Sequence, residues 1–363
     1  MAELEVAGLS GPNPDRNPDR NPDPAAKRSW HVGAGTGVGS LPGTSPDEAA
    51  RVIAGELPEL PHLAELPARG VGADMVGRAL GILVDLFGEV VPSGWRVTRR
   101  PGRDIRRAND LLEWDLDALT EHYAGADWVK LQVCGPWTLA AEVELSSGNR
   151  ALTDDGAVDD IAASLTQGLL DHVSILRRRL PGTDFVVQLD EPQLPAVIAG
   201  SLSTPSGFGT VRAVDRARVG SLLRTVTDGL GDLPTIVHCC HPGAPLHLLR
   251  ASGFQALSID FTGVGTSAAR LDPIGELIEG GTVLMAGLVP GERPAGPDRE
   301  LKVWAAPVLG VFDRLGFPRA ALSERVVPTP TCGLAGADDD WALEAMQTVH
   351  ELARAFQDLP EGW

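Results

Sequence analysis

The chain has 363 residues, of which 43% are hydrophobic and 22% are charged, and its formal net charge is −18. This length is ample for a large core and suits a single α/β barrel. The negative charge argues against binding to nucleic acids or anionic membranes. No apolar run is long enough to span a bilayer and no secretion signal opens the chain, so we expect a cytoplasmic protein. Four cysteines are too few for a disulfide framework and are expected to be reduced thiols.

Residues 1–29 are predicted to form a disordered tail. Within them, residues 13–24 repeat an Asn-Pro-Asp-Arg unit and contain no apolar side chain apart from proline. Such a segment cannot bury enough surface to offset the entropy lost on folding. The folded part is therefore expected to be one domain over residues 30–363.

From about residue 30 onward, apolar or glycine-rich runs alternate with helical patterns. The runs read as strands that end near Ser40, Glu65, Cys134, Asp190, Cys240, Asp260, Gly287 and Thr329. The helical patterns cover residues 46–56, 74–87, 159–180, 215–230, 244–251, 273–278, 299–315 and 337–356. Residues 88–127 read as an excursion with its own short helix. Eight alternations predict a single (β/α)8 TIM-type barrel. A doubly wound sheet is the alternative, but no Gly-x-Gly-x-x-Gly follows a strand.

One apolar run ends in the sequence His238-Cys239-Cys240-His241, and Pro-Gly then closes it. Because side chains alternate along a strand, His238 and Cys240 should share one face while Cys239 points to the other. Burying an imidazole and a thiol without a partner would be costly, so a metal site competes with the simpler reading of core residues.

Two further candidate ligands end other strands. Asp260 closes an apolar run, and Cys332 follows the run at residues 326–327. The active site of a barrel lies at the C-terminal ends of its strands, so these residues should ring the same mouth as His238 and Cys240. Two thiolates, an imidazole and a carboxylate are a plausible zinc set.

The sequence resembles the catalytic half of cobalamin-independent methionine synthase over roughly residues 33–356. The motifs that carry this resemblance are, in chain order, Gly39-Ser40-Leu41-Pro42, Asp74-Met75-Val76, Gly135-Pro136-Trp137-Thr138, Leu189-Asp190-Glu191-Pro192, His238-x-Cys240, Asp260 and Cys332-Gly333-Leu334. Each motif alone is weak, and their order along the chain makes the match specific.

The resemblance implies a zinc methyltransferase on a (β/α)8 barrel that methylates homocysteine. It implies that Zn2+ is held by His238, Cys240, Asp260 and Cys332. Ser40 would hold the substrate carboxylate, and Glu65 and Asp190 would hold the substrate ammonium. The simpler alternative to substrate binding is that Glu65 is a solvated acid in a loop. For Asp190 it is that the carboxylate caps a loop. Trp137 either walls the substrate pocket or packs in the core.

The sequence departs from the family at three points. Asp260 stands where the family has Glu, and no counterpart of the family's large N-terminal half is found. The segment Ala286–Arg293 has no histidine where the family's Asp-x-His-Ser element carries its proton donor. Glu292 is the nearby titratable acid and is the candidate replacement. The donor therefore stays open between methyl-tetrahydrofolate and a methyl-corrinoid or corrinoid protein. A related barrel enzyme, such as one of the uroporphyrinogen decarboxylase type or one acting on another thiol, and a non-catalytic zinc-binding relative are the other readings.

Overall fold

The computed structural model describes residue 30 and residues 32–363, apart from residues 205–206, 266 and 297–298. The predicted tail over residues 1–29 lies outside the described residues. Within the described part of the chain, no helix is both long and apolar enough to cross a membrane.

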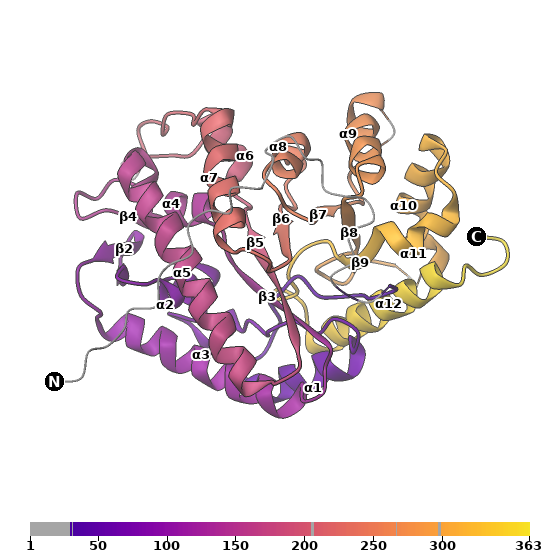
Figure 1. The fold of residues 1–363 in the computed structure, drawn as a ribbon, viewed down its shortest axis with the longest axis horizontal. Helices are drawn as coiled ribbons and strands as arrows, with labels where there is room; N and C mark the ends of the chain where they lie inside the picture. The colour runs from indigo at the N-terminus through magenta and orange to yellow at the C-terminus, as the bar shows by residue number, and fades with distance from the viewer. Residues whose placement is uncertain (1–29, 31, 205–206, 266, 297–298) are drawn as a thin grey trace.

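A curled parallel sheet forms the centre of the molecule (Figure 1). Its six strands stand in the order in which they occur in the chain, and helices lie between successive strands. They are β3 (Trp128–Cys134), β5 (Asp184–Asp190), β6 (Thr235–His238), β7 (Ala256–Asp260), β8 (Val283–Val289) and β9 (Val326–Pro330). Because all pairs are parallel, the C-terminal ends of the six strands lie on one side of the sheet.

The first two predicted strands are not strands in the structure. Residues 34–41 and 61–65, which we call the seam, make only isolated parallel bridges, Ser40 with Glu65 and His62 with Lys130. Towards β9, the Thr36 amide donates a long hydrogen bond of 3.4 Å to the Pro328 carbonyl. An eight-stranded barrel is thus not confirmed, whereas a six-stranded half-barrel is. Glycine at every second position of residues 33–39 explains the irregularity, because glycine weakens a strand.

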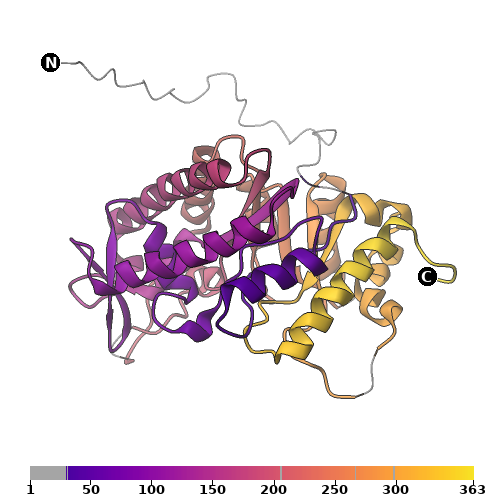
Figure 2. The same ribbon diagram turned by 90° about the horizontal axis from the view of Figure 1, so that it is seen from below.

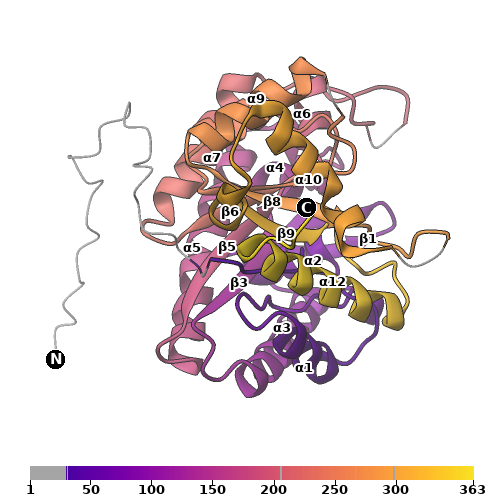
Figure 3. The same ribbon diagram turned by 90° about the vertical axis from the view of Figure 1, so that its right-hand side faces the viewer.

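The helices surround the sheet. Figure 2 shows α3, α1 and α12 side by side, and Figure 3 shows the strands between this group and α9 and α10. The helices are α1 (Pro46–Glu56), α2 (Met75–Ile82), α3 (Arg103–His122), α4 (Pro136–Glu142), α5 (Asp155–Arg179), α6 (Leu194–Ala199), α7 (Arg216–Gly229), α8 (Leu246–Ala251), α9 (Ala268–Glu279), α10 (Leu301–Leu315), α11 (Leu322–Arg325) and α12 (Asp339–Gln357), with the 3-10 turns η1 (Pro67–Arg69), η2 (Ala151–Thr153) and η3 (Arg319–Ala321).

The region over residues 88–127 contains the predicted helix, but this helix is long rather than short. The hairpin β1 (Phe87–Val91) and β2 (Gly94–Thr98) opens this region and pairs with β4 (Val143–Glu144) in a small second sheet. Helix α3 then runs for 20 residues. Its apolar residues recur at helical spacing and are buried, and α3 contacts α1 and α2.

The interior of the half-barrel has an apolar floor and a polar layer above it. Residues of the floor include Val186, Ile236, Ala256 and Val327, which lie on four different strands. Two positions further along the same strands, the buried residues are polar. They are Gln188, His238, Ser258 and Thr329. Because side chains two apart share a face, this polar layer lies just below the C-terminal ends of the strands.

Candidate metal and substrate site

Three of the four predicted metal ligands come together in the structure. His238, Cys240 and Cys332 each offer one ligand atom, and these atoms lie within 4.8 Å of one another. The sulfurs of Cys240 and Cys332 are 3.5 Å apart. His238 ends β6, and Cys332 follows β9, which is three places away in the sheet. In a flat sheet three spacings amount to about 14 Å, so the curl of the sheet is what joins the two ends.

The His238 ring is oriented for coordination. Its Nδ1 lies 2.9 Å from Ser258 Oγ on the neighbouring strand β7. Its Nε2 is buried and has no hydrogen-bond partner among the described residues. A ring held at one nitrogen, with the other nitrogen free beside two thiols, is the usual arrangement of a zinc-ligating histidine. The three residues therefore fit zinc, which prefers nitrogen and sulfur ligands.

The hydrogen bond between the two thiols makes their ionisation interdependent. The pKa of Cys332 is lowered to about 4, first by the hydrogen bond with Cys240 and then by the nearby His238 ring. The pKa of Cys240 is raised, first by the same hydrogen bond and then by burial. Such a pair ionises once with ease, and a bound cation would be needed to hold both as thiolates.

Asp260, the fourth predicted ligand, lies outside this group. It ends β7 two residues beyond Ser258, but its Oδ1 accepts hydrogen bonds from the Thr262 amide at 2.8 Å and the Thr262 hydroxyl at 2.6 Å. These bonds hold the side chain within its own loop, and Asp260 is not in the group whose ligand atoms lie within 4.8 Å of one another. Its role as the fourth ligand stays a prediction.

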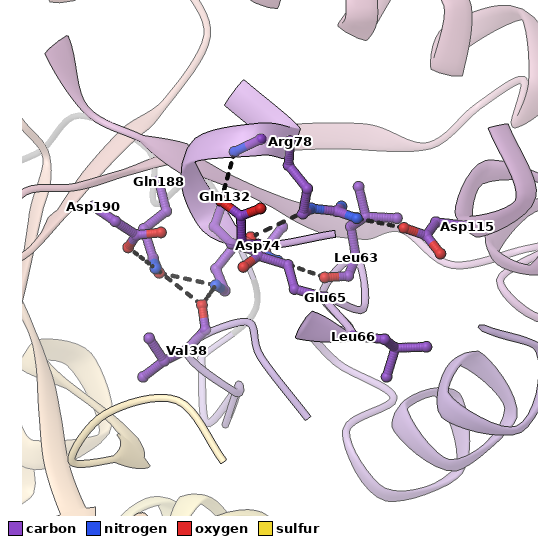
Figure 4. Close-up of polar contacts among 12 residues, drawn as sticks. Val38, Leu63, Glu65, Leu66, Asp74, Arg78, Asp115, Gln132, Gln188 and Asp190 are labelled. Atoms are coloured by element: carbon purple, nitrogen blue, oxygen red, sulfur yellow. Dashed lines mark hydrogen bonds and ion pairs between the residues drawn. The ribbon is translucent and has the colours of Figure 1, made fainter. Parts of the chain in front are cut away.

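The two predicted ammonium-binding acids are buried close to the thiol group and the seam. Asp190 ends β5 and stands in register with His238 on β6. Burial raises the pKa of Asp190 to about 7, against the opposing effect of His238. Burial also raises the pKa of Glu65, against the opposing effect of Arg78, whose Nε lies 3.9 Å from Glu65 Oε1. Figure 4 shows Glu65, Arg78 and Asp190 around the same interior space.

Ser40 connects these acids to the cysteine turn. It bridges Glu65 on the seam, and its carbonyl accepts a hydrogen bond of 2.8 Å from the Leu334 amide. Gly333 packs so closely against Ser40 that an added Cβ would overlap the Ser40 hydroxyl. The residue predicted to hold the substrate carboxylate therefore lies directly against the turn that carries Cys332.

The remaining predicted site residues are Trp137 and Glu292. Trp137 is buried in the helical layer, where its indole donates a 3.2 Å hydrogen bond to the Val219 carbonyl on α7. This position matches the packing alternative, and its predicted substrate contact is not tested. Glu292 is exposed in the loop after β8, beside Gly336 in the loop that follows Cys332. Its role as an acid stays a prediction.

Glu191 explains why two of the sequence motifs occur together. Its carboxylate accepts hydrogen bonds from the Trp137 amide at 3.0 Å and from the Thr138 amide and hydroxyl, each at 2.7 Å. The acid therefore caps the N-terminus of α4. The motifs around residues 135–138 and 189–192 form one unit that fixes the end of β5, and thus Asp190.

The sequence reading missed four polar residues of the interior. They are Lys130, Gln132, Gln188 and Ser258, and all are buried. Each is a polar residue at an alternate position of a strand that is otherwise apolar. That pattern in the sequence was the available signal, because a polar side chain inside a closed sheet needs a partner.

These features define an α/β protein whose curled parallel sheet carries an imidazole and two thiols at its strand ends. The family described as cobalamin-independent synthase, catalytic domain, matches residues 34–355, and the chain belongs to this family. The resemblance seen in the sequence is thereby confirmed.

One of two similar solved structures supports the fold. A B12-independent methionine synthase from Shewanella sp. W3-18-1 in complex with selenomethionine has a TM-score of 0.55 and 13% identity, over 89% of this chain and 97% of that chain. A GH5_18 protein from Streptomyces cattleya in complex with GlcNAc has a TM-score of 0.44 and 15% identity, over 91% and 82% of the two chains. At these identities the likeness concerns the fold alone. No curated protein matches the sequence.

Proposed function

We propose that this protein is a zinc-dependent methyltransferase that transfers a methyl group to the thiol of homocysteine and so forms methionine. Family membership supports a methyltransferase role in methionine synthesis. The observation that carries the zinc part is the group of His238, Cys240 and Cys332 around a free, buried imidazole nitrogen. The similar Shewanella protein is a methionine synthase in complex with selenomethionine, which supports a small amino-acid substrate.

In this proposal His238, Cys240 and Cys332 hold the zinc, with Asp260 as the fourth ligand. Bound zinc would lower the pKa of a substrate thiol, so that its sulfur is a thiolate at neutral pH. Ser258 keeps the His238 ring in the tautomer and orientation that leave Nε2 free.

The remaining task of the protein is to position the substrate, which it does from two sides. Asp190 and Glu65 face the interior as buried acids, and a substrate ammonium would favour their ionised forms. Ser40 lies on the seam beside Glu65 and next to the cysteine turn, whereas Asp190 ends strand β5. Homocysteine held between them would direct its sulfur toward the thiol group.

The first experiment is a comparison of methyl donors with zinc-loaded protein and homocysteine, with methionine as the measured product. Methyl on N5 of a reduced folate is a poor electrophile unless the nitrogen is protonated, and a positioned acid contributes ~10²–10⁴ in rate. Residues 286–293 contain no histidine to serve as that acid. We therefore expect faster methylation from methylcobalamin or a methyl-corrinoid protein than from methyl-tetrahydrofolate.

Glu292→Gln sharpens this comparison. If the folate is the better donor and Glu292→Gln abolishes that reaction, Glu292 has replaced the histidine and the donor preference is wrong. If zinc-loaded protein forms no methionine from any of these donors, the methyltransferase proposal fails. The protein would then be a zinc-binding relative without this activity.

A further inference from the structure

We infer that Lys130, a buried lysine in the middle of β3, is a positioning residue that sets the spacing between the two ends of the amino-acid site. The inference rests on the proposed function, because the two ends are those that would hold the ammonium and carboxylate of homocysteine. Lys130 itself would touch neither group.

Lys130 takes part in a closed set of hydrogen bonds inside the half-barrel. Its side chain is fully buried, and Nζ donates to the Val38 carbonyl and to Gln188 Oε1, both at 2.8 Å. Gln188 Nε2 donates to the same Val38 carbonyl at 3.0 Å and to Asp190 Oδ1 at 2.7 Å. Figure 4 shows Val38, Gln188 and Asp190 in this arrangement.

This set of bonds joins the seam to the regular sheet. Val38 lies two residues before Ser40 on the seam, and Asp190 ends strand β5. In the described part of the chain the first seam segment has few backbone hydrogen bonds. It is joined to β9 and the following turn through the Thr36 and Leu334 amides, and to the second seam segment through the Leu41 amide and the Gly39 carbonyl. Side chains from β3 and β5 therefore add to these few backbone bonds, and they link the Val38 carbonyl to Asp190.

Lysine contributes more to this link than a neutral residue could. An ammonium makes hydrogen bonds roughly twice as strong as those between neutral groups. Without it, the Val38 carbonyl would keep one neutral bond from Gln188, and Gln188 Oε1 would lose the bond that Lys130 donates. The link between Val38 and Asp190 would then be weaker, and the distance between Ser40 and Asp190 would be less tightly set.

A second reading is that Lys130 only balances the charges of the buried acids Asp190 and Glu65, which it faces. The two readings predict opposite changes in the affinity for homocysteine when Lys130 is removed. If Lys130 is merely a resident cation, its removal should tighten the binding of every amine-bearing thiol, because a like charge is removed. If Lys130 sets the spacing, its removal should weaken the ligand that uses both ends.

The test compares three thiols on the full, zinc-loaded chain. Binding is measured by calorimetry for homocysteine, for its analogue without the amino group (4-mercaptobutanoate) and for its analogue without the carboxylate (3-aminopropane-1-thiol). We expect Lys130→Met to weaken the binding of homocysteine by at least about tenfold and the binding of each truncated thiol by less than about threefold. Gln188→Met keeps the lysine and should reduce the preference for homocysteine over the truncated thiols in the same way. This variant provides a second test if Lys130→Met does not fold.

Tyr123→Phe is the matched structural control. The buried Tyr123 hydroxyl also donates to a seam carbonyl, that of His62, at 2.6 Å, but it lies outside the Lys130 set. We expect this variant to lose stability while keeping the wild-type preference among the three thiols.

The outcomes separate the inference from the proposed function. Wild-type protein that binds homocysteine no better than the truncated thiols would overturn the proposed function and the inference with it. If both Lys130→Met and Gln188→Met keep the wild-type preference for homocysteine over the truncated thiols, the inference alone is overturned. Tighter binding of the amine-bearing thiols by Lys130→Met would also overturn it, in favour of charge balance.

Discussion

Strands β6 to β9 and the seam contribute to the same site in different ways. The strands are joined by parallel ladders with one irregularity, between Gly287 and Val289, and the thiol and imidazole groups stand at their ends. The seam has isolated bridges and a few backbone hydrogen bonds instead, and buried side chains of Lys130, Gln188 and Tyr123 also bond to its carbonyls. Regular strands thus position the metal ligands, whereas the substrate end depends in part on side-chain hydrogen bonds. Single substitutions should therefore affect these two regions differently.

The largest effect is expected for the regular region. Cys240→Ser should reduce bound zinc from about one per chain to near zero, because serine is a much weaker zinc ligand than a thiolate. The fold should persist, since the strands are paired without the metal. Metal content and circular dichroism measure the two effects. Cys239→Ser is the control, because Cys239 is buried in the apolar core. Zinc loss from Cys239→Ser with retention in Cys240→Ser would reverse the assignment of the strand faces.

The next effect concerns the boundary between the two regions. Asp190→Asn should weaken the use of homocysteine by ~1–3 kcal/mol, the range for a hydrogen bond to a charged group. The substitution should barely change the use of 4-mercaptobutanoate, which has no ammonium. Values of kcat/KM for both thiols measure the difference. Equal losses for the two thiols would remove Asp190 from ammonium recognition.

A smaller effect is expected when only the support of a ligand is removed. Ser258→Ala deletes the hydroxyl that lies 2.9 Å from His238 Nδ1 and leaves the ladder intact. Zinc affinity should fall about tenfold, the lower end of the range for such outer partners. Competition with a chromophoric chelator gives the affinity. An affinity equal to that of the wild type would show that the strand alone orients His238.

A further effect concerns pH and the acid that follows β5. Burial raises the pKa of Glu191 to about 7. A raised pKa in the folded state stabilises the protein at low pH, and this contribution is lost as the pH rises through 7. Between pH 5 and pH 8 the loss should amount to ~2 kcal/mol in the free energy of unfolding. Urea unfolding at both pH values should show a smaller decline for Glu191→Gln. Identical declines would contradict the raised pKa.

The regular region was largely predictable from the sequence, because its apolar runs end sharply in Asp, Cys or Gly. The alternation expected at the end of β6 correctly placed the Cys239 side chain on the opposite face from His238 and Cys240. The seam was not predictable as irregular, because a glycine-rich run can be read as a strand when backbone partners are unknown. The position of Asp260 depends on the Thr262 hydrogen bonds in a loop, and a pattern of residue types does not encode such a local choice.

The interior links were missed for a related reason. Lys130 and Gln188 were read as ordinary members of apolar strands, although a buried lysine requires acceptors from elsewhere in the fold. Those acceptors are a backbone carbonyl and an amide that lie 92 and 58 residues away in the sequence. Only the closed arrangement of the sheet brings them together.

The contact between Gly333 and Ser40 constrains how this protein can be engineered. An added side chain at residue 333 would overlap the Ser40 hydroxyl, so a substitution there requires this hydroxyl to turn away or the Cys332 turn to move from the seam. A library that aims to change the thiol accepted by the enzyme should therefore leave Gly333 unchanged and vary its surroundings. For the same reason, natural relatives that accept bulkier thiols would have to gain space elsewhere than at this shared boundary.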